Sequence, residues 1–214
     1  MGGGPEHQYR QGVGVSDYEV LVEQIKGCTR CPLSQDRTHA VPGEGSLSAD
    51  IMFIGEGPGF YEDRDGRPFV GPAGQLLEEM LGKIGLSRQD VYITNMLKCR
   101  PPQNRDPQPG EIDSCRPYLD QQIEMISPRV IVTLGRFSFS KFFPGESISR
   151  ERGKPRRWRD LMVFPMYHPA AALHNPGLRP AIENDFSKLP GIIEQASVPD
   201  TPEPAPARQL SMFQ

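Results

Sequence analysis

Short apolar runs alternate with amphipathic stretches along this chain of 214 residues. Continuous apolar runs predict buried strands at residues 51–54, 91–94, 130–134 and 161–167. Apolar side chains at helical spacing predict helices at residues 16–27, 72–84, 111–126, 137–143 and 180–195. Because strands alternate with helices, we expect an α/β fold, a three-layer sandwich with a central four-stranded parallel sheet and helices on both faces.

The two ends lack this patterning. Residues 1–15 are rich in glycine and predict a disordered N-terminal tail, and the Pro/Ala-rich residues 198–208 predict an extended linker. The expected folded domain spans residues 16–197, and apolar side chains reappear only at residues 209–214. No signal peptide and no apolar run of membrane-spanning length are visible, so we expect a cytoplasmic protein without membrane contact.

The charge balance does not single out a partner. The chain has 24 basic and 27 acidic residues, a net charge of -3, which argues against a protein that coats nucleic acid by charge alone. One basic run, residues 150–159, surrounds Trp158. Taken alone, such a run is typical of a solvated surface loop.

Four cysteines are the only ones in the sequence: Cys28, Cys31, Cys99 and Cys115. Four soft thiolates suit one four-ligand metal site, either zinc or an iron–sulfur cluster. Two disulfides are an alternative, but no feature indicates an oxidising compartment, and a Cys-x-x-Cys pair in a cytosolic chain favours metal. A thioredoxin-like redox pair is a further alternative, although no obvious strand precedes Cys31.

Unusual residues follow the predicted strands, where parallel sheets bind their ligands. Residues 55–59, Gly-Glu-Gly-Pro-Gly, match neither a Rossmann nor a P-loop fingerprint, but a ligand can approach such a backbone closely. Asn95 and His168 follow two other strands, and the amide offers the paired donor and acceptor that a nucleobase edge needs. Three carboxylates lie near the glycine loop, those of Glu56, Glu62 and Asp63. Together these residues predict a pocket for a planar polar ring.

These features together resemble the uracil-DNA glycosylases, in particular the iron–sulfur type called family 4. The resemblance runs from about Tyr18 to Ile193 and includes the four cysteines. It also includes five motifs in order: Gly55 to Gly59, Gly66 to Gly71, Thr94-Asn95, Lys98 to Pro102, and His168 to Ala171. In that family the cysteines hold a 4Fe–4S cluster, so the resemblance favours a cluster over zinc.

The resemblance implies hydrolysis of the N-glycosidic bond of uracil in DNA, which leaves an abasic site for base excision repair. It implies that Phe69 stacks on the flipped uracil, with Gly57 also in the uracil site, and that Asn95 hydrogen-bonds O4 and N3–H of the base. His168 is expected to donate to O2 and stabilise the leaving anion. Glu56 is the expected water-positioning group, with Glu62 and Asp63 as alternatives, and Glu62 or its neighbours are expected to exclude the methyl group of thymine.

DNA contacts are expected on two segments. By resemblance, Leu173 or His174 fills the hole that the flipped base leaves in the duplex. Arg156 and Arg157, within the basic run, are expected to contact phosphates or DNA near the cluster.

Two departures from the family pattern bear on activity. Phe60 and Tyr61 stand where many members carry acidic residues, which keeps hypoxanthine or xanthine open as alternative substrates. The loop at residues 100–105 has no histidine, whereas a related subgroup uses one to bond covalently to the DNA sugar. We therefore expect ordinary turnover and release.

The C-terminus resembles the short peptide with which bacterial repair proteins dock on the sliding clamp; the expected contact residues are Gln209, Leu210, Met212 and Phe213. The expected protein is therefore a bacterial, nucleoid-associated monomer that acts on uracil-containing DNA. Two other functional classes stay open, an iron–sulfur electron carrier and a non-catalytic binder of damaged DNA.

Overall fold

The computed structural model describes residues 15–196. The predicted linker, the terminal clamp peptide and all but the last residue of the predicted N-terminal tail lie outside the described residues. The described part forms a six-stranded sheet in the order β1-β3-β2-β4-β6-β5. The strands are β1 (Glu44–Gly45), β2 (Ile51–Gly55), β3 (Tyr92–Asn95), β4 (Val130–Leu134), β5 (Arg156–Trp158) and β6 (Leu161–Met166).

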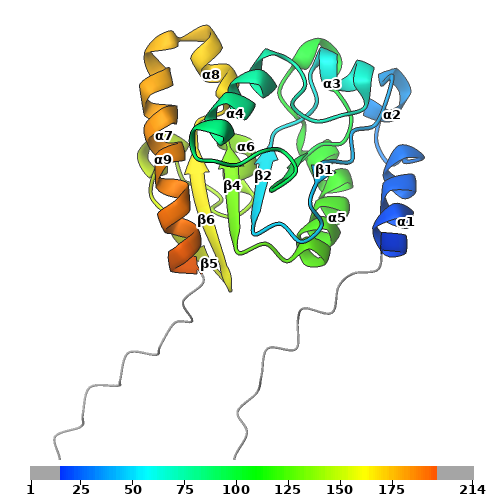
Figure 1. Cartoon of the computed structure of the whole chain (residues 1–214). Helices are drawn as coiled ribbons and strands as arrows, with labels where there is room; N and C mark the ends of the chain where they lie inside the picture. The colour runs from blue at the N-terminus through cyan, green and yellow to red at the C-terminus, as the bar shows by residue number, and fades with distance from the viewer. Residues whose placement is uncertain (1–14, 197–214) are drawn as a thin grey trace, which may run out of the picture.

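The four central strands are parallel, as the apolar runs predict, and β2, β4 and β6 run side by side in Figure 1. Both edge strands are antiparallel to their neighbours, β1 to β3 and β5 to β6. The sheet is therefore larger and more mixed than the four parallel strands expected from the sequence. The edge strands β1 and β5 have only two and three residues and carry mostly polar side chains, so the sequence shows no apolar run at either position. Part of the basic run, predicted as a surface loop, is the edge strand β5.

Helices cover both faces of the sheet, which confirms the predicted α/β sandwich. On one face α4 (Pro72–Lys83), α8 (Pro169–His174) and α9 (Arg179–Ala196) bury an apolar cluster that includes Leu77, Phe53 and Phe186. On the other face α1 (Val15–Lys26), α5 (Pro109–Ile126) and α6 (Arg136–Ser140) contribute to a second cluster. The remaining helical segments are α2 (Leu33–Asp36), α3 (Phe60–Asp65), η1 (Pro102–Asn104), α7 (Ile148–Glu151) and η2 (Pro176–Leu178).

Local signals explain where the long helices begin. Pro72 and Pro109 stand in the first turns of α4 and α5, where a residue without an N–H is best tolerated. In α5 the backbone N–H of Gln108 donates to Glu111 at 2.8 Å, so the helix starts two residues before the predicted position 111. The short helix α3 was not predicted, because six residues after a glycine-rich loop show no helical period.

The register of the sheet places the site. Gly55 pairs with Asn95 across the parallel strands β2 and β3, so the glycine loop and the asparagine both lie at the carboxyl ends of these strands. His168 follows β6 at the same end and starts α8. Within residues 15–196, no helix has the length and apolar content needed to cross a membrane.

Candidate active site

A cavity of about 580 Å³ opens beyond the carboxyl ends of the central strands. Its wall contains seven residues that the sequence predicts for the site: Glu56, Gly57, Glu62, Phe69, Asn95, His168 and His174. The structure does not bring Asp63, Leu173, Arg156 or Arg157 into this wall. Phe60 and Tyr61 also lie outside it and are largely exposed, so neither side chain shapes the cavity.

Asn95, the last residue of β3, lines the cavity and carries an acceptor that no group uses. The residue is 1% exposed, and its Oδ1 atom is buried without any hydrogen-bond partner. A buried amide oxygen without a partner is costly, so a ligand with a matching N–H donor would bind here favourably. The backbone carbonyl of Asn95 is held separately by Lys98, whose Nζ donates to it at 2.8 Å.

Phe69 also lines the cavity, and its backbone conformation is unusual. Its φ angle is 53°, a left-handed value that costs an aromatic residue about 1–3 kcal/mol. The ring fits because β2 ends in glycine, since a Cβ atom at Gly55 would lie 2.7 Å from Phe69 Cζ and 2.2 Å from Asn95 Oδ1. The ring also stacks on the imidazole of His168, with centroids 5.4 Å apart and planes inclined by 25°.

His168 caps α8 and presents a neutral imidazole to the cavity. Its Nδ1 atom accepts a hydrogen bond from the backbone N–H of Ala170 at 3.1 Å. Burial lowers the pKa of His168 to about 4, although the carboxylate of Glu62 acts in the opposite direction. At neutral pH the ring is therefore uncharged, and its Nε2–H is the available donor.

The three candidate carboxylates have three different environments. Glu56 lines the cavity, and burial, reinforced by Asp106, raises its pKa despite the opposing charge of Arg136. Glu62 also borders the cavity, but its two oxygens accept hydrogen bonds from the backbone N–H groups of Gly59, Val70 and Gly71 at 3.1, 3.0 and 2.9 Å.

Asp63 is the third candidate carboxylate, and it points elsewhere. It is 6% exposed, and its Oδ1 atom accepts from the backbone N–H groups of Thr38 and His39 at 2.9 and 3.4 Å. Of the three, Glu56 is the one that lines the cavity and has no backbone hydrogen-bond partner for its carboxylate within the described residues, so it is best placed to hold a water molecule.

Comparison with known proteins places this geometry in a family. A profile of the Uracil DNA glycosylase superfamily matches residues 42–188, a range that includes every residue of the cavity wall. The chain belongs to the uracil-DNA glycosylase superfamily.

Within this superfamily the chain is similar to type-4 uracil-DNA glycosylases. It is 54% identical to that of Sulfurisphaera tokodaii over 181 residues, 80% of this chain and 82% of the relative. It is 47% identical to that of Thermotoga maritima over 182 residues, 83% of this chain and 95% of the relative. Identity to the type-5 uracil-DNA glycosylase of Pyrobaculum aerophilum is 30% over 194 residues, 75% of this chain and 85% of the relative. The chain therefore belongs with the type-4 members.

The four cysteines of the chain lie together, and none of them lines the cavity. Cys99 and Cys115 are buried in an apolar cluster beside α1 and α5, and Cys28 and Cys31 pack against it. None of the four is in a disulfide bond. The guanidinium of Arg37 donates to Cys99 Sγ at 3.1 Å, so the site already offers a positive partner to a sulfur that becomes negative on ligation. These residues fit a thiolate-ligated group.

In the part of the chain that the structure describes, no group of three or more His, Cys, Asp or Glu side chains is arranged to hold one ion. In an iron–sulfur cluster the protein thiolates bind different iron atoms and need not converge on one point.

The sequence did not reveal two buried or half-buried residues that hydrogen-bond the backbone of the site. The ammonium of Lys98 is fully buried and donates to Thr94 Oγ1 and Gln122 Oε1 at 2.7 and 2.6 Å, as well as to the Asn95 carbonyl. Lysine is normally exposed, so a sequence gives no sign that one lies beneath a ligand site. Arg88, which holds the backbone of Phe69, was missed for the same reason.

Proposed function

We propose that this protein hydrolyses the N-glycosidic bond of uracil in DNA, releasing uracil and leaving an abasic site. The observation that carries the proposal is the buried, unpartnered Oδ1 of Asn95 in a cavity that also holds the stacked rings of Phe69 and His168. A stacking ring, a base-pairing amide and a neutral donor are the groups that recognition of a flipped pyrimidine requires.

Recognition depends on the polarity of the amide. The Oδ1 atom of Asn95 is expected to accept from uracil N3–H, while the amide NH₂ donates to O4. Cytosine presents the opposite polarity at both positions and would leave buried polar groups unpaired. Mismatches of this kind give discrimination of about 10⁴ or more.

Departure of the base depends on His168. Uracil leaves as an anion while the sugar acquires positive character, so a donor at O2 lowers the barrier without transferring a proton. A pKa of about 4 keeps the imidazole neutral, and its Nε2–H is the group that is free to donate. Glu56 is the carboxylate that we expect to position the attacking water. We assign Glu62 a structural role, which is to hold the backbone N–H groups of the loop that it binds.

We assign DNA contacts to the end of α8 and to the basic run. Leu173 is 49% exposed near the end of α8, and neighbouring His174 borders the cavity, so the pair is suited to fill the gap left by the flipped base. In the basic run, the charge of Arg156 is partly compensated by Glu146. We expect both Arg156 and Arg157 to contact phosphates, and the salt dependence of DNA affinity measures this.

We infer that the four cysteines hold a 4Fe–4S cluster. When bound, the cluster supplies structural cross-linking between the segment after α1, the loop after β3 and α5. Arg37 would then compensate part of the negative charge on the thiolate of Cys99.

We further infer that residues 198–208 are a tether for a clamp-binding peptide at residues 209–214, which would hold a monomeric enzyme at replicating DNA. Deletion of residues 209–214 is expected to abolish binding to a bacterial sliding clamp and to leave excision from naked oligonucleotides intact. Unchanged clamp affinity would contradict this inference.

The proposed activity is tested by excision assays on oligonucleotides that carry uracil, hypoxanthine, xanthine, or thymine opposite guanine. We expect abasic sites from the uracil substrate alone. An electron carrier would leave every substrate unbound and intact, and a damage binder would bind the uracil substrate without cleaving it. Cleavage at hypoxanthine or xanthine would extend the activity to other deaminated bases.

A further inference from the structure

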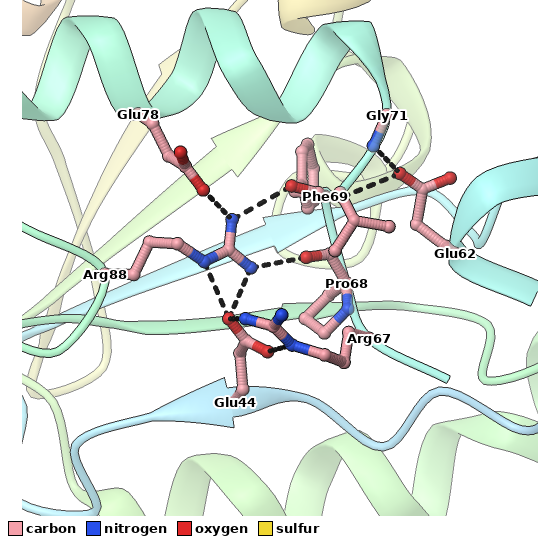
Figure 2. Close-up of polar contacts among 9 residues, drawn as sticks. Glu44, Glu62, Arg67, Pro68, Phe69, Gly71, Glu78 and Arg88 are labelled. Carbon is pink, nitrogen blue, oxygen red and sulfur yellow. Dashed lines mark hydrogen bonds and ion pairs between the residues drawn. The ribbon is translucent and has the colours of Figure 1, made fainter. Parts of the chain in front are cut away.

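Arg88 lies outside the cavity wall but hydrogen-bonds the backbone around Phe69, whose ring is expected to stack on the base. It comes from the segment between α4 and β3, and its side chain is 13% exposed. Its Nη2 atom donates to the carbonyl of Pro68 at 2.5 Å, and its Nη1 atom donates to the carbonyl of Phe69 at 2.9 Å. Figure 2 shows the guanidinium between α4, β1 and this turn.

Two glutamates hold the guanidinium in place. Glu44, in β1, accepts from Nε at 2.6 Å and lies 2.5 Å from Nη2, and Glu78, in α4, accepts from Nη1 at 3.2 Å. Every N–H donor of Arg88 is therefore used. Arg67 pairs with the same Glu44, at 2.8 Å from Nε, and fixes the orientation of that carboxylate (Figure 2).

The turn around Phe69 is held from both sides by opposite charges. Arg88 donates to the carbonyls of residues 68 and 69, and Glu62 accepts from the N–H groups of residues 70 and 71. Pro68 has no N–H of its own to stabilise the turn. Gly74 leaves room for the Phe69 carbonyl, because a Cβ atom there would lie 1.7 Å from that oxygen.

We propose that Arg88 is a positioning residue for base recognition, which holds Phe69 in its left-handed conformation so that the ring stands ready to stack on the flipped base. The proposal rests on the function proposed above. A left-handed aromatic residue returns to an extended or helical conformation unless its neighbours fix it, and that change swings the ring out of the cavity. Arg88 supplies the contacts that oppose this change at both carbonyls.

The test is a double-mutant cycle on the full-length protein, measured as the single-turnover rate of uracil excision. Arg88→Gln should lower the rate about ten- to hundred-fold in the parent protein, because misplacing a recognition group by about 1 Å has effects of this size. In a Phe69→Ala background the same substitution should change the rate by less than about two-fold, because the ring that Arg88 positions is gone.

Arg179→Gln is the matched control. Arg179 also lies between two glutamates, at 3.0 Å from Glu183 and in close contact with Glu79, but within the described residues it makes no hydrogen bond to a backbone carbonyl of the cavity. It should leave the rate within about two-fold of the parent in both backgrounds. Arg88→Lys keeps the charge but concentrates its donors on one nitrogen, which cannot span both carbonyls and Glu44, so it should behave like Arg88→Gln. It replaces Arg88→Gln if that variant does not fold.

The outcomes separate this inference from the proposed function. Equal losses on Arg88 substitution in the parent and Phe69→Ala backgrounds would show a general structural effect and overturn the positioning role. A parent-like rate for both Arg88 variants would overturn it as well. If Phe69→Ala itself excises uracil at the parent rate, the stacking role in the proposed function fails, and the role of Arg88 fails with it.

Discussion

The backbone N–H of Ala170 donates to Nδ1 of His168 at 3.1 Å, and this bond determines which nitrogen of the imidazole carries the proton. Because Nδ1 accepts, the neutral ring carries its proton on Nε2. The residue that caps α8 thus presents an uncharged N–H donor to the cavity. A neutral donor stabilises the anion that develops on departing uracil by a hydrogen bond, without transferring its proton.

The first prediction concerns the titration of His168. We expect a pKa of about 4, below the ordinary value of 6.5, because burial disfavours the imidazolium. The folded-state pKa is the lower one, so the contribution of this group to stability is complete above pH 6.5 and is lost as the pH falls through about 4. Nitrogen-15 NMR of the ring should show the Nε2–H tautomer throughout the neutral range. A midpoint near 6.5 would contradict the assignment.

The second prediction separates Glu56 from Glu62. Burial raises the pKa of Glu56, so the excision rate should fall on its acid side as the pH drops through that raised value. Glu56→Gln should lower the rate about 10²-fold, flatten this acid limb and leave thermal stability unchanged. Glu62→Gln should instead reduce the free energy of unfolding by about 1–3 kcal/mol, because three backbone N–H groups lose a charged acceptor. An acid limb that persists in Glu56→Gln would exclude Glu56 as its source.

The third prediction uses the glycine at the end of β2. Gly55→Ala places a methyl group where the Phe69 ring and the Asn95 amide now lie, so we expect about a 10²-fold loss of excision rate. Gly82→Ala is the matched control, since a Cβ atom there meets nothing within 4 Å and the residue lies within α4. That variant should keep full activity and gain about 0.4–1 kcal/mol of stability. Equal activity of the two variants in the single-turnover assay would rule out the packing described at Gly55.

The fourth prediction concerns the cysteines. Cys99→Ala should remove the visible absorption and the bound iron of the purified protein and lower its melting temperature, because the cluster links segments that are distant in sequence. Iron content, absorption spectra and thermal unfolding measure this. A colourless variant of unchanged stability would show that the cluster has no structural role.

The sequence carries the framework of this site because its strands are continuous apolar runs that end at the residues of interest. Ile51–Gly55 leads directly into the glycine loop, and Tyr92–Asn95 ends on the amide. The edge strand Arg156–Trp158 could not be found in this way, because its side chains are mostly charged and only pairing with β6 makes it a strand.

The contacts that organise the site are also invisible in the sequence. Glu56, Glu62 and Asp63 look equivalent along the chain. The fold alone places Glu56 and Glu62 at the cavity and gives Glu62 and Asp63 their backbone N–H partners. Arg88 looks like an ordinary loop arginine, but its partners Phe69 and Glu44 lie 19 and 44 residues away. Such long-range pairs depend on tertiary structure and leave no local pattern.

The most direct test of the account is the single-turnover rate of uracil excision by Asn95→Ala, with the exposed Asn184→Ala in α9 as the matched control. We expect Asn95→Ala to lose about 10²–10³-fold in rate while its melting temperature stays near that of the parent, and Asn184→Ala to match the parent. Excision by Asn95→Ala at the parent rate would contradict the claim that this buried amide recognises the flipped base.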